Sequence, residues 1–176
     1  LSGTSINELN LLEFNQVNNL QTLNLANCTY LGTLRVNSTS LNNINLTGCS
    51  ALFTLSLVNC PLTTLSLVDF NVLYYLTINN TLLTHLDLSR CSNLREVNLD
   101  HNLLSFIDFT ACTDLRDLSC QFNQLTTLNF STCPVLYVLN CSNNVLTSLY
   151  IKNGSFENGL NISNNPNLSF ICVDDN

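Results

Sequence analysis

Residues 115–135 read LRDLSCQFNQLTTLNFSTCPV, and this stretch contains one short pattern twice. LRDLSCQFN begins at Leu115 and LTTLNFSTC begins at Leu125, and both follow the form LxxLxLxx with a final Asn or Cys, except that the third Leu is replaced by the apolar residues Cys120 and Phe130. A first series of such half-repeats begins at residues 20, 41, 62, 83, 104, 125 and 146. A second series begins at residues 31, 52, 73, 94, 115 and 136. Each series has a period of 21 residues, so the chain is a repeat array made of half-repeats of 10 and 11 residues.

The LxL centre of each half-repeat predicts a short β-strand, because successive side chains of a strand point to opposite faces. The two apolar residues then point inward and the middle residue points outward. A 21-residue unit cannot bury its apolar side alone, so coils stack and share one core. We predict an all-β, flattened right-handed solenoid of about seven 21-residue coils, with parallel β-sheets on both faces and little or no helix.

The ends of the chain depart from the repeat, and we predict one domain over residues 1–176 with three parts. Residues 1–19 form an atypical N-terminal coil around Ile6, Leu9 and Leu11, and residues 20–156 are regular repeats. Residues 157–176 form a C-terminal capping coil, in which Glu157 replaces the leading Leu and Pro166 is inserted.

The ninth position of each half-repeat is expected to point inward and to pair with backbone groups of the turn. In the second series it is Thr39, Cys60 or Thr81 in the early coils, and in the first series it is Phe70 in one coil and Gly154 in the last. We predict that the remaining members form a structural ladder: Cys28, Cys49, Cys91, Cys112 and Cys133 in the first series, and Asn102, Asn123 and Asn144 in the second.

The nine cysteines favour packing over chemistry. No two are closer than eight residues, whereas zinc sites use close pairs, so no metal site is predicted. Cys120 and Cys141 occupy an aliphatic column at the sixth position, and cysteine packs as a small apolar residue. We expect buried free thiols, with one or two disulfides as the alternative; Cys172 falls on an outward position and is the expected exception.

Composition excludes several functions. The net charge is −7 with five basic residues, which disfavours nucleic acid as a partner, and no apolar run is long enough for membrane insertion. His85 and His101 are the two histidines, and no motif of a hydrolase, metalloprotease or phosphate-binding loop is present. We therefore predict that the protein is not an enzyme and needs no cofactor.

The two outward faces differ in composition. The first series presents mostly Thr, Ser and Asn, which predicts a solvated strand face; an ice- or crystal-binding Thr ladder is the alternative, but His85 and Phe106 interrupt it. The second series presents aromatic and charged residues of the kind found at binding hot spots. We predict a partner-binding face made of Phe53, Tyr74, Tyr75, Arg95, Glu96, Arg116, Asp117, Phe122 and Tyr137.

An alternative interpretation of the same face is structural. Arg95 with Asp117, and Glu96 with Arg116, could form cross-strand ion pairs, while the aromatic residues cover turns.

The array resembles the secreted leucine-rich repeat proteins of Bacteroidetes, in the subclass with nested LxxLxLxxN halves (the IRREKO type). The resemblance covers residues 20–173 and includes the closing run IKNGSFENGLNISNNPNLSFICVDD at 151–175, where Ile171-Cys172 replaces the usual Cys-Ile order. The resemblance implies export to the bacterial cell surface by the type IX secretion route, with outer-membrane association, and a role in binding or adhesion.

From the array and its two faces we predict a non-catalytic recognition module. It would bind a protein partner in a surface complex, or mediate adhesion, through the concave sheet of the second series. A carbohydrate-binding module and a purely structural spacer are the alternatives. No direct membrane insertion by this segment is expected.

Overall fold

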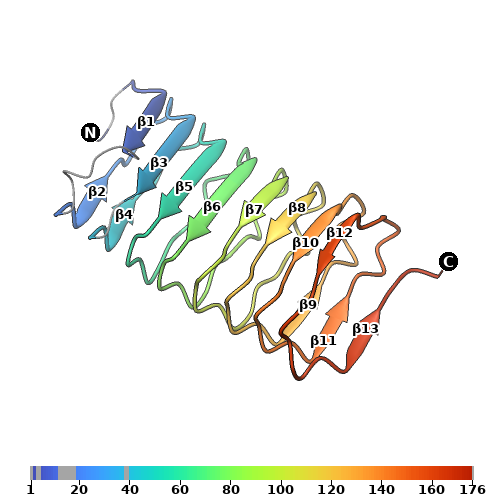
Figure 1. Cartoon of the computed structure of the whole chain (residues 1–176). Helices are drawn as coiled ribbons and strands as arrows, with labels where there is room; N and C mark the ends of the chain where they lie inside the picture. Colours follow the sequence, from blue (N-terminus) through green and yellow to red (C-terminus); the bar gives the residue numbers. More distant parts are fainter. Residues whose placement is uncertain (1, 3–4, 12–18, 38–39, 176) are drawn as a thin grey trace.

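The computed structural model describes residues 2, 5–11, 19–37 and 40–175. Within these ranges all regular secondary structure is β-strand. The strands stack along one axis, with β1 near the N-terminal end of the array and β13 near the C-terminal end (Figure 1). The predicted all-β solenoid of about seven coils, with parallel sheets and no helix in the described ranges, is confirmed. Its strands are β1 (Glu8–Leu11), β2 (Thr22–Asn24), β3 (Thr33–Asn37), β4 (Asn43–Asn45), β5 (Thr54–Val58), β6 (Tyr75–Asn79), β7 (Glu96–Asn98), β8 (Asp117–Ser119), β9 (Thr127–Asn129), β10 (Val138–Asn140), β11 (Ser148–Tyr150), β12 (Gly159–Asn161) and β13 (Phe170–Cys172).

The second series builds one continuous parallel sheet. The sheet also takes β1 and β12 from the two terminal coils, and its eight strands follow the order β1-β3-β5-β6-β7-β8-β10-β12. From β3 onward the register advances by one repeat at each step, for example Tyr75 opposite Glu96 and Glu96 opposite Asp117. The half-repeat around Leu9 supplies the first strand, which pairs with β3. Equivalent positions of successive coils therefore form straight columns across this face.

The first series forms two shorter sheets. β2 pairs with β4 near one end, and β9, β11 and β13 pair near the other. Between them, residues 62–112 contain no first-series strand, although LxxLxL recurs there. Neighbouring coils still bond at the corner, as where Leu82 N donates to Leu62 O at 3.0 Å. The LxL pattern sets side-chain direction, whereas a strand also requires the neighbouring backbone at hydrogen-bonding distance.

The core is a continuous column of buried Leu, Ile, Val, Phe and Cys side chains between the two faces. Its largest members are Phe70, Phe109 and Phe130, all from the first series, and the rings of Phe109 and Phe130 lie 5.3 Å apart. Coils thus share one core, as stacking of incomplete units requires.

The last described coil presents part of the core columns to solvent. Leu139 and Leu149 are 0% exposed, whereas their column neighbours in the last coil, Leu160 and Ile171, are 43% and 42% exposed. Glu157 stands at the leading position and accepts a hydrogen bond from Ser155 Oγ at 2.7 Å.

In the described residues, no helix is both long and apolar enough to cross a bilayer.

Candidate functional site

Buried Asn side chains fix the coils that carry the candidate surface. Asn123 Nδ2 donates to the carbonyls of Leu99, Cys120 and Gln121, at 2.9, 3.1 and 3.3 Å. Its Oδ1 accepts from Leu104 N at 3.0 Å. Asn102 and Asn144 donate in the same way to their own and the preceding coil. Each amide therefore satisfies buried turn groups and ties one coil to its neighbour.

The ninth-position cysteines lie inside the other face. Cys28, Cys49, Cys91, Cys112 and Cys133 are all buried, and Cys49 Sγ donates to Leu25 O at 3.2 Å. Burial raises the pKa of Cys91 to about 11 and that of Cys112 to about 12. All nine cysteines are free thiols, eight of them buried. Neutral, buried thiols are poor nucleophiles, so this column supports packing.

Cys120 and Cys141 lie in the aliphatic column of the second series and are also fully buried. Burial raises the pKa of the Cys141 thiol to about 12 and the pKa of the Cys120 thiol well above its ordinary value. Cys172 is half-buried. Thr39, at the ninth position of an early coil, lies outside the described residues. In the described residues, no three His, Cys, Asp or Glu side chains are grouped to hold a metal ion.

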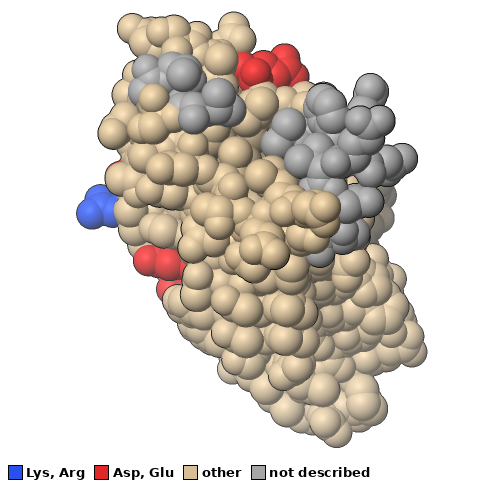
Figure 2. All heavy atoms as spheres, turned by 90° about the vertical axis from the view of Figure 1, so that its left-hand side faces the viewer, with Lys and Arg blue, Asp and Glu red and all other residues tan. Residues whose placement is uncertain are grey.

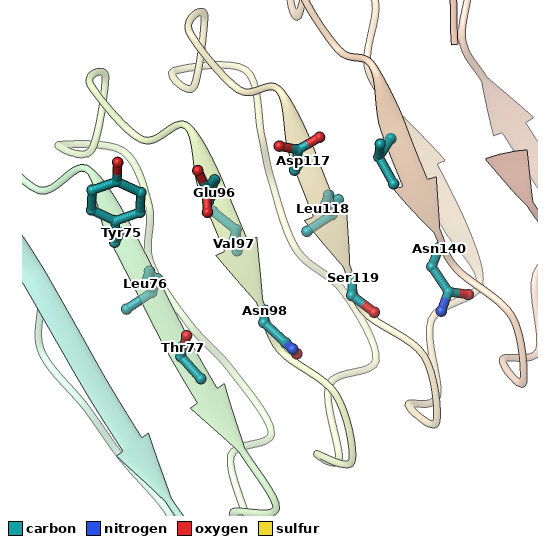
Figure 3. A pocket seen from close by; sticks show the side chains of 11 residues that line it. Tyr75, Leu76, Thr77, Glu96, Val97, Asn98, Asp117, Leu118, Ser119 and Asn140 are labelled. Atoms are coloured by element: carbon teal, nitrogen blue, oxygen red, sulfur yellow. The ribbon is translucent and has the colours of Figure 1, made fainter. Parts of the chain in front are cut away.

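The outward face of the eight-stranded sheet is hollowed over β6, β7, β8 and β10. The hollow has a volume of about 500 Å³. Two rows of side chains cross it: Tyr75, Glu96 and Asp117 in one, and Thr77, Asn98, Ser119 and Asn140 in the other (Figure 3). Val138 continues the first row opposite Asp117. The hollow therefore combines an aromatic ring, two carboxylates and several neutral hydrogen-bonding groups.

Tyr74, Tyr75 and Arg95 form a contact group at the rim of this hollow. The two tyrosine rings lie 4.6 Å apart at an angle of 53°, and the Arg95 guanidinium carbon lies 4.6 Å from the centre of the Tyr74 ring. This cation–π contact positions the Arg95 side chain over Tyr74. The side chain of Tyr75 is exposed.

The cross-strand ion pairs considered from the sequence do not form. Among the described residues the ion pairs are Arg35 with Glu8, at 3.1 Å, and Lys152 with Asp175, at 2.5 Å. Register places Glu96 opposite Asp117, so each carboxylate faces another carboxylate in the adjacent strand.

The remaining predicted residues lie around this group. Phe53 and Tyr137 are exposed at the same rim, on coils to either side, and Arg116 lies between Arg95 and Tyr137 in that row. The Phe53 ring covers Gly32, where an added Cβ would lie 2.8 Å from the ring. Eight of the nine predicted residues therefore lie in two adjacent rows. The rim row contains Phe53, Tyr74, Arg95, Arg116 and Tyr137, and the first row of the hollow contains Tyr75, Glu96 and Asp117.

Phe122 lies apart from them, at the opposite end of the strands. Its ring stacks on His101, which the sequence-based site did not include. Both residues occupy the eighth position, where neighbouring coils carry Asn59, Asn80 and Asn143 with positive φ. An aromatic pair within an Asn column was the sequence signal for this feature.

The N-terminal end of the array is largely uncharged. Seen from the N-terminal end, the described residues show few Lys, Arg, Asp or Glu side chains (Figure 2). Only 10% of the residues are charged, which agrees with this view.

Comparison with solved structures finds the same architecture elsewhere. The functional domain of InlJ from Listeria monocytogenes, which includes a cysteine ladder, matches 96% of this chain with a TM-score of 0.57 and 20% sequence identity. The fold is a leucine-rich-repeat-like solenoid. This chain covers 48% of the InlJ structure and so spans about half its length.

A complex of TLR13 with ssRNA13 matches 94% of this chain and 41% of that one, with a TM-score of 0.43 and 17% identity. No model of a protein family matches the sequence, and the search of curated proteins finds no match either. The absence of catalysis, cofactors and nucleic-acid binding stays a prediction.

Proposed function

We propose that this chain is a non-catalytic recognition module that binds a protein partner through the outward face of its eight-stranded sheet. One observation carries the proposal: Tyr74, Tyr75 and Arg95 are grouped at the rim of a hollow that contains Glu96 and Asp117. Tyrosine and arginine side chains are enriched at the energetic centres of protein interfaces. These groups lie in the strands of the eight-stranded sheet or directly before them, so their backbone is fixed and less entropy is lost on binding.

The other face offers less for recognition. Its first-series strands form two separate sheets, and its outward columns are mainly Thr, Ser and Asn. The contrast between the faces of one repeat supports the second series as the binding side. A repeat unit that needed only to act as a spacer would not require this contrast.

The test is partner capture with matched variants. Tyr74→Ala combined with Arg116→Ala should abolish capture of a partner from the native source, while circular dichroism and the melting temperature show an intact fold. Thr84→Ala combined with Phe106→Ala, on the first-series face, is the control and should capture the partner normally. Equal loss in both variants, or loss in neither, would contradict the proposal.

Carbohydrate binding is the second candidate function, and Tyr75 with Asn98 and Asn140 favours it. An exposed ring beside neutral amides can stack on a sugar and hydrogen-bond to its hydroxyls. A glycan array with the wild-type chain and the Tyr75→Ala variant separates the candidates. Glycan binding that the variant loses would support this candidate; an array without binding would exclude the glycans that it displays.

The proposed setting is the bacterial cell surface, with outer-membrane association and export by the type IX route in a member of the Bacteroidetes. The resemblance of the repeat and of the closing run at 151–175 supports this setting. Protease treatment of intact cells tests it: the protein should be degraded while a cytoplasmic marker survives. Survival of the protein alongside the marker would contradict a surface location.

A further inference from the structure

The two carboxylates of the hollow lie in an unfavourable arrangement. Glu96 and Asp117 are direct register partners on β7 and β8, where neighbouring strands are about 4.8 Å apart. Like charges directly opposite one another destabilise a sheet. Glu96 is exposed and Asp117 is half-buried, so water screens the repulsion only in part.

Among the described residues, no cation forms an ion pair with either carboxylate. Arg95 lies over the Tyr74 ring, and Arg35 and Lys152 pair with other carboxylates. Arg116 forms no ion pair with Glu96 or Asp117 within the described part of the chain.

Asp100, a carboxylate at the far end of the same face, shows the contrast. Its side chain accepts hydrogen bonds from Ser119 Oγ at 2.6 Å, Gln121 N at 3.0 Å and Gln121 Nε2 at 3.0 Å. No described residue donates a hydrogen bond to the carboxylates of Glu96 and Asp117. The fold therefore provides internal partners for one carboxylate of this face and leaves two without them.

The walls of the hollow suit a long basic side chain. Tyr75 and Val138 lie on either side of the carboxylate pair in the same row, and both are exposed. Lys and Arg have apolar stems that pack on such surfaces while the charged head reaches its partner. Asn98 and Ser119 in the second row add hydrogen-bonding groups two residues further along the same strands.

We propose that this hollow receives a Lys or Arg side chain of the protein partner, with the charged head between Glu96 and Asp117 and the stem between Tyr75 and Val138. The proposal rests on the proposed function and names the chemistry of the partner. The unpartnered sheet face, its charge and the size of the hollow together define one occupant, a basic protein segment.

Nuclear magnetic resonance with a short peptide tests the occupant directly. The probe is acetyl-Gly-Thr-Lys-Thr-Gly-amide, added to the isotope-labelled chain at up to about 10 mM, a range suited to millimolar affinity. Amide shifts should change at 75–77, 96–98, 117–119 and 138–140. Acetylation of the peptide lysine, or Glu96→Gln with Asp117→Asn, should weaken binding about tenfold, since each removes a close charge pair.

A matched control removes the same charge from the other face. Asp87 and Asp108 lie on adjacent first-series half-repeats, and each accepts a hydrogen bond from a backbone N–H. The side-chain oxygen of Asn at the same position would accept the same hydrogen bond. Asp87→Asn with Asp108→Asn should bind the peptide as the wild type does. Equal weakening in both double variants would reveal a general charge effect and overturn the proposal.

Two further results would also overturn it. One is the absence of shift changes with the lysine peptide, and the other is a response at these residues to calcium chloride but not to the peptide. A different result separates the proposed function from the proposal of a basic side chain. A partner that the Tyr74→Ala/Arg116→Ala variant loses but the Glu96→Gln/Asp117→Asn variant retains would uphold recognition by this face and reject the basic side chain.

Discussion

The rings of His101 and Phe122 stack with centroids 4.4 Å apart and planes inclined by 10°, although both residues have positive φ, at 54° and 55°. Bulky residues rarely adopt this left-handed conformation, which Asn tolerates. On either side, Asn80 Nδ2 donates to Asn59 Oδ1 at 2.7 Å and Asn164 Nδ2 donates to Asn143 Oδ1 at 2.8 Å. The stack therefore interrupts a hydrogen-bonded Asn column at a strained position.

Replacing His101 and Phe122 together by Asn should stabilise the chain. Relief of the left-handed strain is worth about 1 kcal/mol per residue, and loss of the aromatic pair costs about 0.5–1.5 kcal/mol. The expected net gain is about 1 kcal/mol in the free energy of unfolding, measured by urea denaturation. A loss of stability would mean that the stack outweighs the strain.

Asn123→Ala should be strongly destabilising, because it removes three donated hydrogen bonds and one accepted hydrogen bond from buried turn groups. A single unsatisfied buried group costs about 1–3 kcal/mol, so a decrease of about 3 kcal/mol is expected. Gln124→Ala, at the exposed neighbour, is the control and should change stability by less than about 0.5 kcal/mol. Similar values for the two variants would show that the ladder contributes little.

Thiol reagents should distinguish Cys172 from the other cysteines. In the native chain at pH 8, the half-buried Cys172 should react first, while the eight buried thiols react only after denaturant is added. Titration with a chromogenic disulfide reagent measures both phases. Fast reaction of several native thiols would contradict the packing role of the cysteine columns.

Stability should fall as pH rises through the range of about 9 to 12. The thiols of Cys112 and Cys141 have a pKa of about 12 in the fold and 9.0 as the ordinary value, so the unfolded chain loses these protons first. Below pH 9 both states keep the protons, and the contribution to stability is constant. Urea denaturation under reducing conditions measures the slope, which should be shallower in Cys112→Val; an unchanged slope would show that the Cys112 thiol does not contribute to it.

Glu96→Gln should stabilise the free chain slightly, because it removes the repulsion from Asp117 across β7 and β8. Cross-strand pairs of this kind are worth about 0.2–1 kcal/mol, and the gain should shrink as salt increases. Melting temperatures at low and high ionic strength provide the measurement. A decrease in stability at low salt would show that Glu96 has a favourable partner.

The repeat allowed the columns to be predicted because strand geometry fixes side-chain direction. Leu118, Cys120 and Asn123 point inward as the alternation requires, and Tyr75, Glu96 and Asp117 share one outward column. The pattern could not predict that residues 62–112 lack first-series strands, since backbone spacing depends on how whole coils stack.

The detailed pairing of the candidate site was also beyond the sequence. Asp117 lies one strand away from Arg95, yet the Arg95 guanidinium lies over the Tyr74 ring. Several possible partners lie at similar distances, and the sequence does not show which of them the side chain contacts. The hollow depends on the sizes of side chains from four strands and has no signature in any single half-repeat. His101 was noted in the sequence, but its stack with Phe122 required the three-dimensional register.

The amide of Asn144 bonds to its own coil and to the coil before it, at Cys141 O and Cys120 O. Coupling of this kind reaches only the nearest neighbour, so the array should lose structure progressively from its ends inward. The 21-residue period also determines which insertions and deletions the array tolerates. Loss or duplication of 21 residues would return every later side chain to its own face, whereas a change of 10 or 11 residues would exchange the two faces and place the hollow's residues on the opposite side.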